Sequence, residues 1–257
     1  MIAIDLSGKI ALVIGGSRGI GAAITETLAK AGAEVVFTHT GNPVHADGVR
    51  LLLERLRAQG GKASSQILDA VDYEGTLSLV SRIVAEKGKI DILVHNAGFS
   101  SVRPMEEKKI EEWQKTVDIN LTSAFCSVKA VIPHMVKQGN GKIVIIGSSA
   151  IYSGGGGAID YAASKSGLVG MALYLARNYA KKGIVTNVIH PCLIETDMLK
   201  TRYNTKEALE KLKEQIPVGR LGKPEDIAGL VAFLVSPMGD YICGQSILVD
   251  GGRTYCH

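Results

Sequence analysis

The strongest constraint on the fold is a regular alternation of short aliphatic runs with longer amphipathic stretches. The runs expected to form strands are 9–14, 34–38, 62–68, 91–96, 142–148, 185–190 and 246–250. The stretches with helical periodicity between them are 19–32, 43–59, the segment before Gly88, 112–137, 161–182 and 224–235. Strands this short and continuously apolar are buried on both faces, which requires covering helices. The pattern predicts an α/β protein with a Rossmann fold: a doubly wound, seven-stranded parallel sheet with helices on both faces.

The chain shows no linker, repeat or charge block that would divide it, so we expect one domain over residues 1–257. Residues 197–216 and 220–226 are rich in Lys, Glu, Thr and Pro and have weaker periodicity. We expect them to form a surface lid, centred on 197–216, that encloses a substrate. The glycine run at 154–157 is expected to form a mobile loop.

Several classes of protein are disfavoured by the composition. The net charge of +4 and pI of about 8.8 are too mild for a nucleic-acid-binding face. No apolar run approaches the roughly 18 residues of a membrane span, and the N-terminus lacks the basic region of a signal peptide. The histidines are scattered and the four cysteines (Cys126, Cys192, Cys243 and Cys256) form no C-x-x-C motif. We therefore expect a soluble cytoplasmic protein with no disulfide, no metal, no nucleic acid and no membrane partner.

A glycine-rich loop follows the first expected strand and precedes the first expected helix. Its sequence, Gly15-Gly16-Ser17-Arg18-Gly19-Ile20-Gly21, has the spacing G-x-x-x-G-x-G. Glycines at 15, 19 and 21 allow a tight turn and the close approach of a pyrophosphate, which the helix N-terminus would stabilise. The loop predicts dinucleotide binding, although tight strand-to-helix packing alone is the other explanation.

The end of the second strand bears on which dinucleotide is bound. NAD sites usually carry Asp or Glu there, but this strand ends Phe37-Thr38-His39-Thr40. Arg18 could bind a 2′-phosphate, with Thr38 and His39 as helpers, or it could be a solvated loop cation. We expect NADP(H) rather than NAD(H). Asp69, after the third strand, is expected either to hydrogen-bond the adenine or to cap the next helix.

Tyr161 and Lys165 stand four residues apart at the start of an expected helix and therefore share a face. A neighbouring ammonium and an oxidised nicotinamide would both lower the pKa of the phenol, making it a usable acid and base. Ser148 ends the fifth strand 13 residues earlier, at the carboxyl edge where α/β folds bind ligands. The conjunction of the three residues predicts a proton-transfer site.

These motifs make the chain resemble the short-chain dehydrogenase/reductase family over essentially its whole length, and its 3-oxoacyl-(acyl carrier protein) reductase-like branch in particular. The resemblance rests on the glycine loop, His95-Asn96-Ala97-Gly98, Asp118-Ile119-Asn120, Ser148, Tyr161 with Lys165, Ile194 to Met198, Gly222 to Asp226, Gly244-Gln245 and Val249 to Gly252.

The resemblance implies roles for these residues. Ser148 would hydrogen-bond the substrate oxygen, Tyr161 would exchange its proton, Lys165 would hold the nicotinamide ribose and Asn120 would position a relay water, with hydride passing between nicotinamide C4 and a carbonyl carbon. Ordinary packing is the alternative for each residue. The implied cofactor-binding set is Gly15, Ser17, Arg18, Gly19, Ile20, Gly21, Thr38, His39, Asp69, Asn96, Ala97, Gly98, Tyr161, Lys165, Pro191, Ile194 and Thr196.

Three positions depart from the family pattern. Ile14 replaces Thr, His95 replaces the first Asn, and Cys192 replaces the Gly after Pro191. If position 192 requires a positive φ, cysteine would be strained by roughly 1 to 2 kcal/mol and would crowd the nicotinamide. A redox role for Cys192 is an alternative. Ile14 lacks the hydroxyl and is expected to loosen the turn.

Three functions are consistent with the sequence: an NADPH-dependent reductase of 3-oxoacyl thioesters or similar ketones, a sugar, polyol or steroid alcohol dehydrogenase, and an NADP-binding scaffold without turnover. An acidic acyl carrier protein could dock on Lys181 and Lys182 with Lys137 and Lys142, or these could be solvated termini. The family usually pairs helices 112–137 and 161–182 in a homotetramer. The apolar residues Leu168, Met171, Ala172 and Leu175 fit that interface, and they fit core packing equally well.

Overall fold

The seven aliphatic runs form one parallel sheet in the order β3-β2-β1-β4-β5-β6-β7, in a computed structural model that describes residues 3–254. Every neighbouring pair of strands is parallel. This is the doubly wound order expected of a Rossmann fold, and the predicted fold class is confirmed. The strands are β1 (Ile10–Ile14), β2 (Glu34–His39), β3 (Lys62–Ile67), β4 (Ile92–His95), β5 (Gly141–Ile146), β6 (Ile184–Pro191) and β7 (Ser246–Val249).

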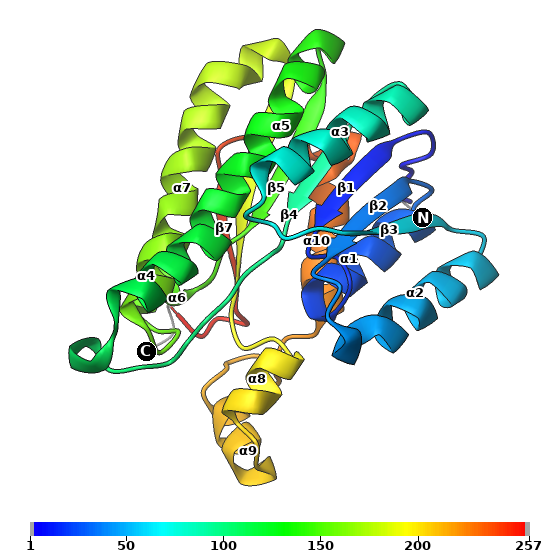
Figure 1. The fold of residues 1–257 in the computed structure, drawn as a ribbon. Helices are drawn as coiled ribbons and strands as arrows, with labels where there is room; N and C mark the ends of the chain where they lie inside the picture. The colour runs from blue at the N-terminus through cyan, green and yellow to red at the C-terminus, as the bar shows by residue number, and fades with distance from the viewer. Residues whose placement is uncertain (1–2, 255–257) are drawn as a thin grey trace.

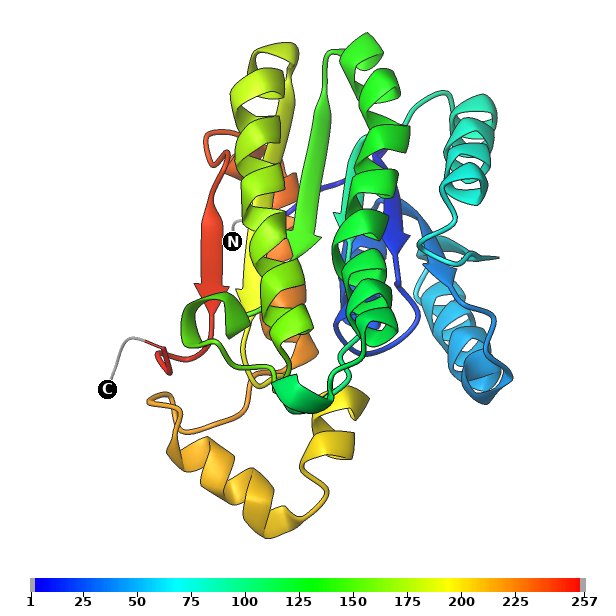
Figure 2. The same cartoon turned by 60° about the vertical axis from the view of Figure 1, so that its left-hand side comes forward.

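Alternate residues of the central strands feed two separate cores, because successive strand side chains point to opposite faces. Ala11 and Val13 pack with α1 (Gly19–Lys30), α2 (Ala46–Ala58) and α10 (Pro224–Val235). Leu12 and Ile14 pack on the other face with α3 (Tyr73–Lys87), α5 (Ser123–Gln138) and α7 (Ile159–Tyr179). Figures 1 and 2 show α5 and α7 on one side of the sheet and α10 on the other.

The stretch expected as one helix over 112–137 is interrupted. It consists of α4 (Ile110–Val117), a π-helical segment (Asp118–Thr122) and α5, so one wide turn lies between two α-helices. By length and composition alone, Ile110–Gln138 could cross a membrane, but half of its most apolar window is buried inside the molecule. That burial is typical of a core helix.

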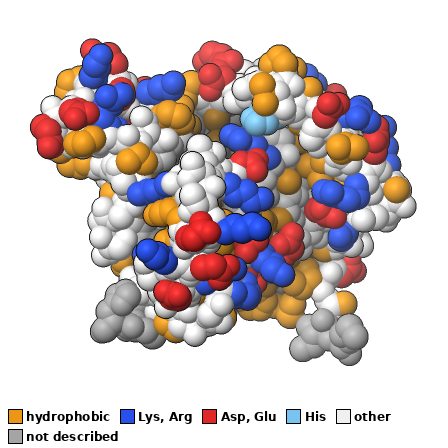
Figure 3. Space-filling view, turned by 90° about the horizontal axis from the view of Figure 1, so that it is seen from below, with side chains coloured by type: hydrophobic (Ala, Val, Ile, Leu, Met, Phe, Trp, Pro, Cys, Tyr) orange, Lys and Arg blue, Asp and Glu red, His pale blue; other side chains and the backbone are white. Residues whose placement is uncertain are grey.

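Two short helices, α8 (Asp197–Arg202) and α9 (Lys206–Glu214), lie beyond the carboxyl ends of the strands (Figures 1 and 2). They share a small apolar cluster of their own, made by Leu199, Leu212, Ile216 and Leu221. Seen from below, the molecule presents intermixed acidic and basic side chains here (Figure 3). We refer to residues 193–216 as the α8–α9 segment.

Residues 220–226 extend this segment only at Leu221, which belongs to its apolar cluster. Gly222 forms a parallel bridge with Ile194, and Pro224 begins α10, which packs against α1. The polar residues of this stretch are explained by the start of a core helix, since Arg220 pairs with Asp226 in its first turn. The remaining short elements are α6 (Ala150–Ser153) and the 3-10 turns Pro43–His45, Met105–Glu107, Ala180–Lys182 and Pro237–Gly239.

Two further expectations concern surface residues. Lys142 is not an exposed docking cation: it is largely buried and pairs with Asp240. Within residues 3–254 the cysteines Cys126, Cys192 and Cys243 are free thiols. Cys256 lies outside the described residues.

Candidate active site

The glycine loop connects β1 to α1, and its geometry requires glycine. Gly15 and Gly19 have φ values of +75° and +51°, in the left-handed region. A Cβ on Gly21 would lie only 2.0 Å from the carbonyl oxygen of Gly15. The side chain of Asn96 holds the loop by donating from Nδ2 to that same oxygen at 2.8 Å. The result is a cradle that any side chain would fill, at the N-terminus of α1, and it fits the pyrophosphate of a dinucleotide.

The residues expected to bind a dinucleotide gather at the same edge of the sheet as this loop. Thr38 and His39 end β2, Asp69 follows β3, and Asn96, Ala97 and Gly98 follow β4. Beyond β6, the chain returns to the loop, because a Cβ on Gly19 would lie 3.1 Å from Thr196 Cγ2. The topology therefore brings the predicted set together, and the set is Gly15, Ser17, Arg18, Gly19, Ile20, Gly21, Thr38, His39, Asp69, Asn96, Ala97, Gly98, Pro191, Ile194 and Thr196.

The side chains near the end of β2 differ in how free they are to contact a ligand. Arg18 is exposed, and no hydrogen bond or ion pair engages its side chain among the described residues. The Thr38 hydroxyl is buried and accepts a hydrogen bond from Gly15 N–H at 3.1 Å, so it supports the loop from behind. His39 Nδ1 accepts from Gly41 N–H, and desolvation lowers its pKa, which favours a neutral ring. Of the three, Arg18 is the group suited to a 2′-phosphate.

The suggestion that Asp69 caps the following helix is wrong. Asp72 is the N-cap of α3, and its Oδ1 accepts from Gly75 N–H at 2.9 Å. Asp69 instead accepts from Val71 N–H within the preceding turn and remains exposed at the edge of the sheet.

Tyr161 and Lys165 lie in the first two turns of α7, which begins two residues earlier than expected. Lys165 is buried, its Nζ donates to Ile146 O at the end of β5 at 2.9 Å, and burial lowers its pKa to about 8. For Tyr161, burial raises the pKa of the phenol, and a hydrogen bond with Ser148 and the charge of Arg202 oppose that rise. The Lys165 ammonium is directed to the strand backbone, and its lowering of the phenol pKa beside a bound nicotinamide stays a prediction.

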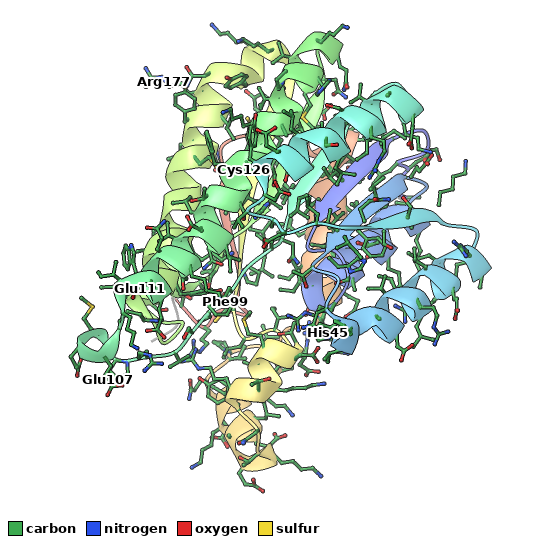
Figure 4. The ribbon with its side chains drawn as sticks, viewed as in Figure 1. His45, Phe99, Glu107, Glu111, Cys126 and Arg177 are labelled. Carbon is green, nitrogen blue, oxygen red and sulfur yellow. The ribbon has the colours of Figure 1, made fainter. Side chains whose placement is uncertain are left out.

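Asn120 occupies the π-helical segment and is fully buried. Its Oδ1 accepts from Phe99 N–H at 2.7 Å, and its Nδ2 donates to Phe99 O at 2.9 Å and to Ser164 Oγ at 3.0 Å. Phe99 lies just beyond the end of β4 (Figure 4). Asn120 thus ties the loop after β4 to the helix that carries Tyr161. A Cβ on Gly98 would be 3.3 Å from Lys165 Nζ and 3.5 Å from Asn120 Oδ1, so both groups border the open face of Gly98.

A residue that sequence reasoning missed, His190, fixes Ser148. His190 Nδ1 accepts from Ser148 N–H at 3.1 Å, and its Nε2 lies 2.7 Å from Ser246 Oγ. Burial lowers the pKa of His190 to about 4, so the ring is neutral and Nε2 is the nitrogen that donates. The available signal was a titratable residue at the carboxyl end of the expected strand 185–190.

The three departures from the family pattern have simple structural outcomes. Ile14 is fully buried in the core, and His95 is buried between Ser123 and Ser127, each 3.1 Å from a ring nitrogen. Cys192 does not have a positive φ; within residues 3–254, the non-glycine residue that does is Leu193, at 47°. The strain considered for Cys192 therefore falls one residue later.

The site combines a dinucleotide cradle with a phenol, a buried ammonium, a hydroxyl and an amide at one sheet edge. A family model described as enoyl-(acyl carrier protein) reductase matches residues 14–254. The chain belongs to the short-chain dehydrogenase/reductase family. It is 42% identical over 248 residues to the 3-oxoacyl-[acyl-carrier-protein] reductase FabG of Escherichia coli strain K12, covering 96% of this chain and 98% of that one.

Solved structures of this oxidoreductase family superpose closely on the chain. A protein proposed to be a gluconate dehydrogenase from Agrobacterium tumefaciens has a TM-score of 0.93 at 34% identity, with all of both chains covered. A protein proposed to be an NAD(P)-dependent gluconate 5-dehydrogenase from Beutenbergia cavernae, with bound NADP at low occupancy, has a TM-score of 0.90 at 32% identity and covers 98% of this chain and 99% of that one.

Proposed function

We propose that this protein is an NADP(H)-dependent oxidoreductase that interconverts a substrate carbonyl and its alcohol. The observation that carries the proposal is the convergence of Ser148, Tyr161 and Lys165 with the glycine cradle at one edge of the sheet. When bound, the nicotinamide supplies or accepts the hydride. Open α/β sheets bind ligands at this edge.

The proton chemistry belongs to the chain itself. Tyr161 donates its hydroxyl proton to the carbonyl oxygen in reduction and accepts the alcohol proton in oxidation. Ser148, held by His190, hydrogen-bonds the same oxygen and stabilises the charge that develops there. Asn120 Oδ1 accepts one hydrogen bond from Phe99 N–H and has a second lone pair. We propose that this lone pair binds a water that, together with Lys165, carries the proton between Tyr161 and the solvent. Lys165 would also hold the nicotinamide ribose when the cofactor is bound.

The preference for NADP(H) rests on Arg18. No carboxylate follows Thr38 and His39 to bind ribose hydroxyls, and the Arg18 guanidinium is exposed and unpaired among the described residues. Arg18→Ala should raise the Kd for NADPH by about 10-fold or more and leave the Kd for NADH within about twofold. Fluorescence titration measures both. An equal change for the two cofactors would refute the assignment.

The leading substrates are 3-oxoacyl thioesters or similar ketones, on the strength of the 42% identity to FabG. The second candidates are sugar and polyol substrates, including sugar acids, favoured by the TM-score of 0.93 to the proposed gluconate dehydrogenase. A panel of acetoacetyl thioesters, sugars, sugar acids and cyclic ketones, run with NADPH and NADH, decides between them. Thioester turnover no faster than sugar turnover would remove the first. NADPH binding without turnover of any compound would indicate a scaffold.

We further propose a cytoplasmic homotetramer that pairs α4–α5 and α7 between subunits. Exposed apolar side chains on these helices, Phe125, Leu173 and Tyr174, support this interface. An acyl carrier protein would dock on the exposed lysines Lys137, Lys181 and Lys182. Light scattering after size-exclusion chromatography should give four times 27.2 kDa. A monomer would refute the assembly.

A further inference from the structure

One cation near Tyr161 has no role in the proposed proton transfer. Arg202 ends α8, and its side chain is exposed with no hydrogen bond or ion pair among residues 3–254. Several other exposed arginines are paired with carboxylates, among them Arg50 with Glu54, Arg103 with Glu112 and Arg220 with Asp226, whereas Arg18, Arg57 and Arg177 resemble Arg202 in having no such partner among the described residues. An arginine without a carboxylate partner near a candidate proton donor is a candidate binding group for an anion.

The contacts of Arg202 place it beside the proton donor. A Cβ on Gly157 would lie 2.6 Å from Arg202 Nη2, and a Cβ on Gly156 would lie 2.5 Å from the ring of Tyr161. Both glycines have positive φ values, a conformation that glycine allows, and they bring the loop against both side chains. Because adjacent Cα atoms are about 3.8 Å apart, these contacts put the guanidinium within about 12 Å of the phenol ring.

Two further observations support a defined position for this cation. The guanidinium carbon lies 5.6 Å from the centre of the Tyr203 ring, a cation–π contact that restricts its orientation. The charge of Arg202 also lowers the pKa of Tyr161 against the larger effect of burial, as a neighbouring cation does.

We propose that Arg202 is the anion subsite of the substrate pocket and binds a substrate carboxylate only a few bonds from the reacting carbonyl. The inference rests on the proposed function, since it takes Tyr161 as the proton donor. The upper limit of about 12 Å separates a carboxylate on a small substrate from the phosphate of a pantetheine arm, which lies at the far end of that arm from the thioester. Arg18 then binds the 2′-phosphate of the cofactor, and Arg202 binds the carboxylate of the substrate.

The test compares acids with their neutral esters. The probes are 3-oxobutanoate, 4-oxopentanoate and 5-oxohexanoate, each with its methyl ester, and the readout is the acid-to-ester ratio of kcat/KM with NADPH. Arg202→Met should lower that ratio by about 10- to 100-fold for at least one chain length. Using the ratio cancels any general effect of Arg202 on the Tyr161 proton. Arg202→Lys should retain part of the preference, because lysine keeps the charge and loses the two-pronged contact.

Lys200→Met is the matched control. Lys200 lies on the same helix and lines a separate small cavity with Glu195, Lys206 and Lys213, so removing its charge should leave the ratio unchanged. The same acids and esters are titrated by saturation-transfer NMR in the wild type and Arg202→Met, which yields a binding ratio even where turnover is absent. A binding ratio that falls in a protein with no turnover would refute the proposed function and support the subsite.

Two results would overturn the inference. One is an acid-to-ester ratio that agrees within about twofold between wild type and Arg202→Met in both assays. The other is a change in the relative kcat/KM of acetoacetyl-CoA and acetoacetyl-N-acetylcysteamine in Arg202→Met, with no change in the acid-to-ester ratio. That result would mean that Arg202 binds a distant phosphate of coenzyme A.

Discussion

Replacing His95 with Asn should flatten the pH dependence of stability. His95 is fully buried, and burial, with a smaller contribution from the charge of Lys165, lowers its pKa to about 3. The unfolded chain binds the proton at about 6.5. Between these values the unfolded state holds more protons than the folded state, so stability falls as the pH drops below about 6.5.

The size of the effect follows from the shift. A pKa difference of one unit corresponds to about 1.4 kcal/mol. On going from pH 7 to pH 5, only the roughly 1.5 pH units below the unfolded-state pKa of about 6.5 contribute. His95 should therefore account for a loss of about 2 kcal/mol in the free energy of unfolding between these two pH values. The neutral ring satisfies both neighbours, because one nitrogen donates and the other accepts, and an Asn amide can do the same without titrating.

Urea denaturation followed by circular dichroism at pH 5, 6 and 7 measures this directly. The quantity to compare is the loss of stability between pH 7 and pH 5, which removes any constant packing cost of the substitution. His190→Gln is a second comparison, because burial also lowers the pKa of His190. A pH 7 to pH 5 loss that is equal in the wild type and His95→Asn would show that His95 does not cause the pH dependence.

Two other predictions concern the loop and the buried ammonium. Gly21→Ala should abolish measurable NADPH binding, since its Cβ would meet Gly15 O at 2.0 Å. The control is Gly229→Ala in α10, whose Cβ would have nothing within 4 Å; this variant should bind NADPH normally, and its free energy of unfolding should rise by up to about 1 kcal/mol. Equal NADPH affinities in the two variants would contradict this prediction. Lys165→Met should lose turnover yet raise the free energy of unfolding at pH 7 by about 2 kcal/mol. The fall of the ammonium pKa from 10.5 to about 8 corresponds to a cost of about 3.4 kcal/mol, of which the hydrogen bond lost at Ile146 O returns about 1.5 kcal/mol. A Met variant less stable than the wild type at pH 7 would contradict that cost.

The elements that sequence predicts well are those fixed by local pattern. The run 9–14 becomes β1 over residues 10–14, and the expected helix 224–235 is reproduced in full, because burial on one or both faces leaves a clear periodicity. The π-helical turn at Asn120 is hidden, since one extra residue in a long helical stretch barely alters that periodicity.

The properties that sequence did not predict depend on residues far apart in the chain. His190 meets Ser148 across 42 positions, and Arg202 acts on Tyr161 from a different helix. The Tyr-x-x-x-Lys spacing correctly placed Tyr161 and Lys165 in one helix, but only the fold shows that Lys165 donates to the end of β5. Spacing therefore located the candidate site, and tertiary contacts set its electrostatics.

The most direct measurement for the proposed chemistry is NADPH oxidation by Tyr161→Phe alongside its NADPH Kd. Turnover of the best ketone should fall by at least about 1,000-fold, while the Kd should stay within about threefold, because phenylalanine keeps the ring packed on Gly156 and removes only the hydroxyl that carries the proton. A Phe variant that binds NADPH normally and turns over at the wild-type rate would contradict the assignment of Tyr161 as the proton donor.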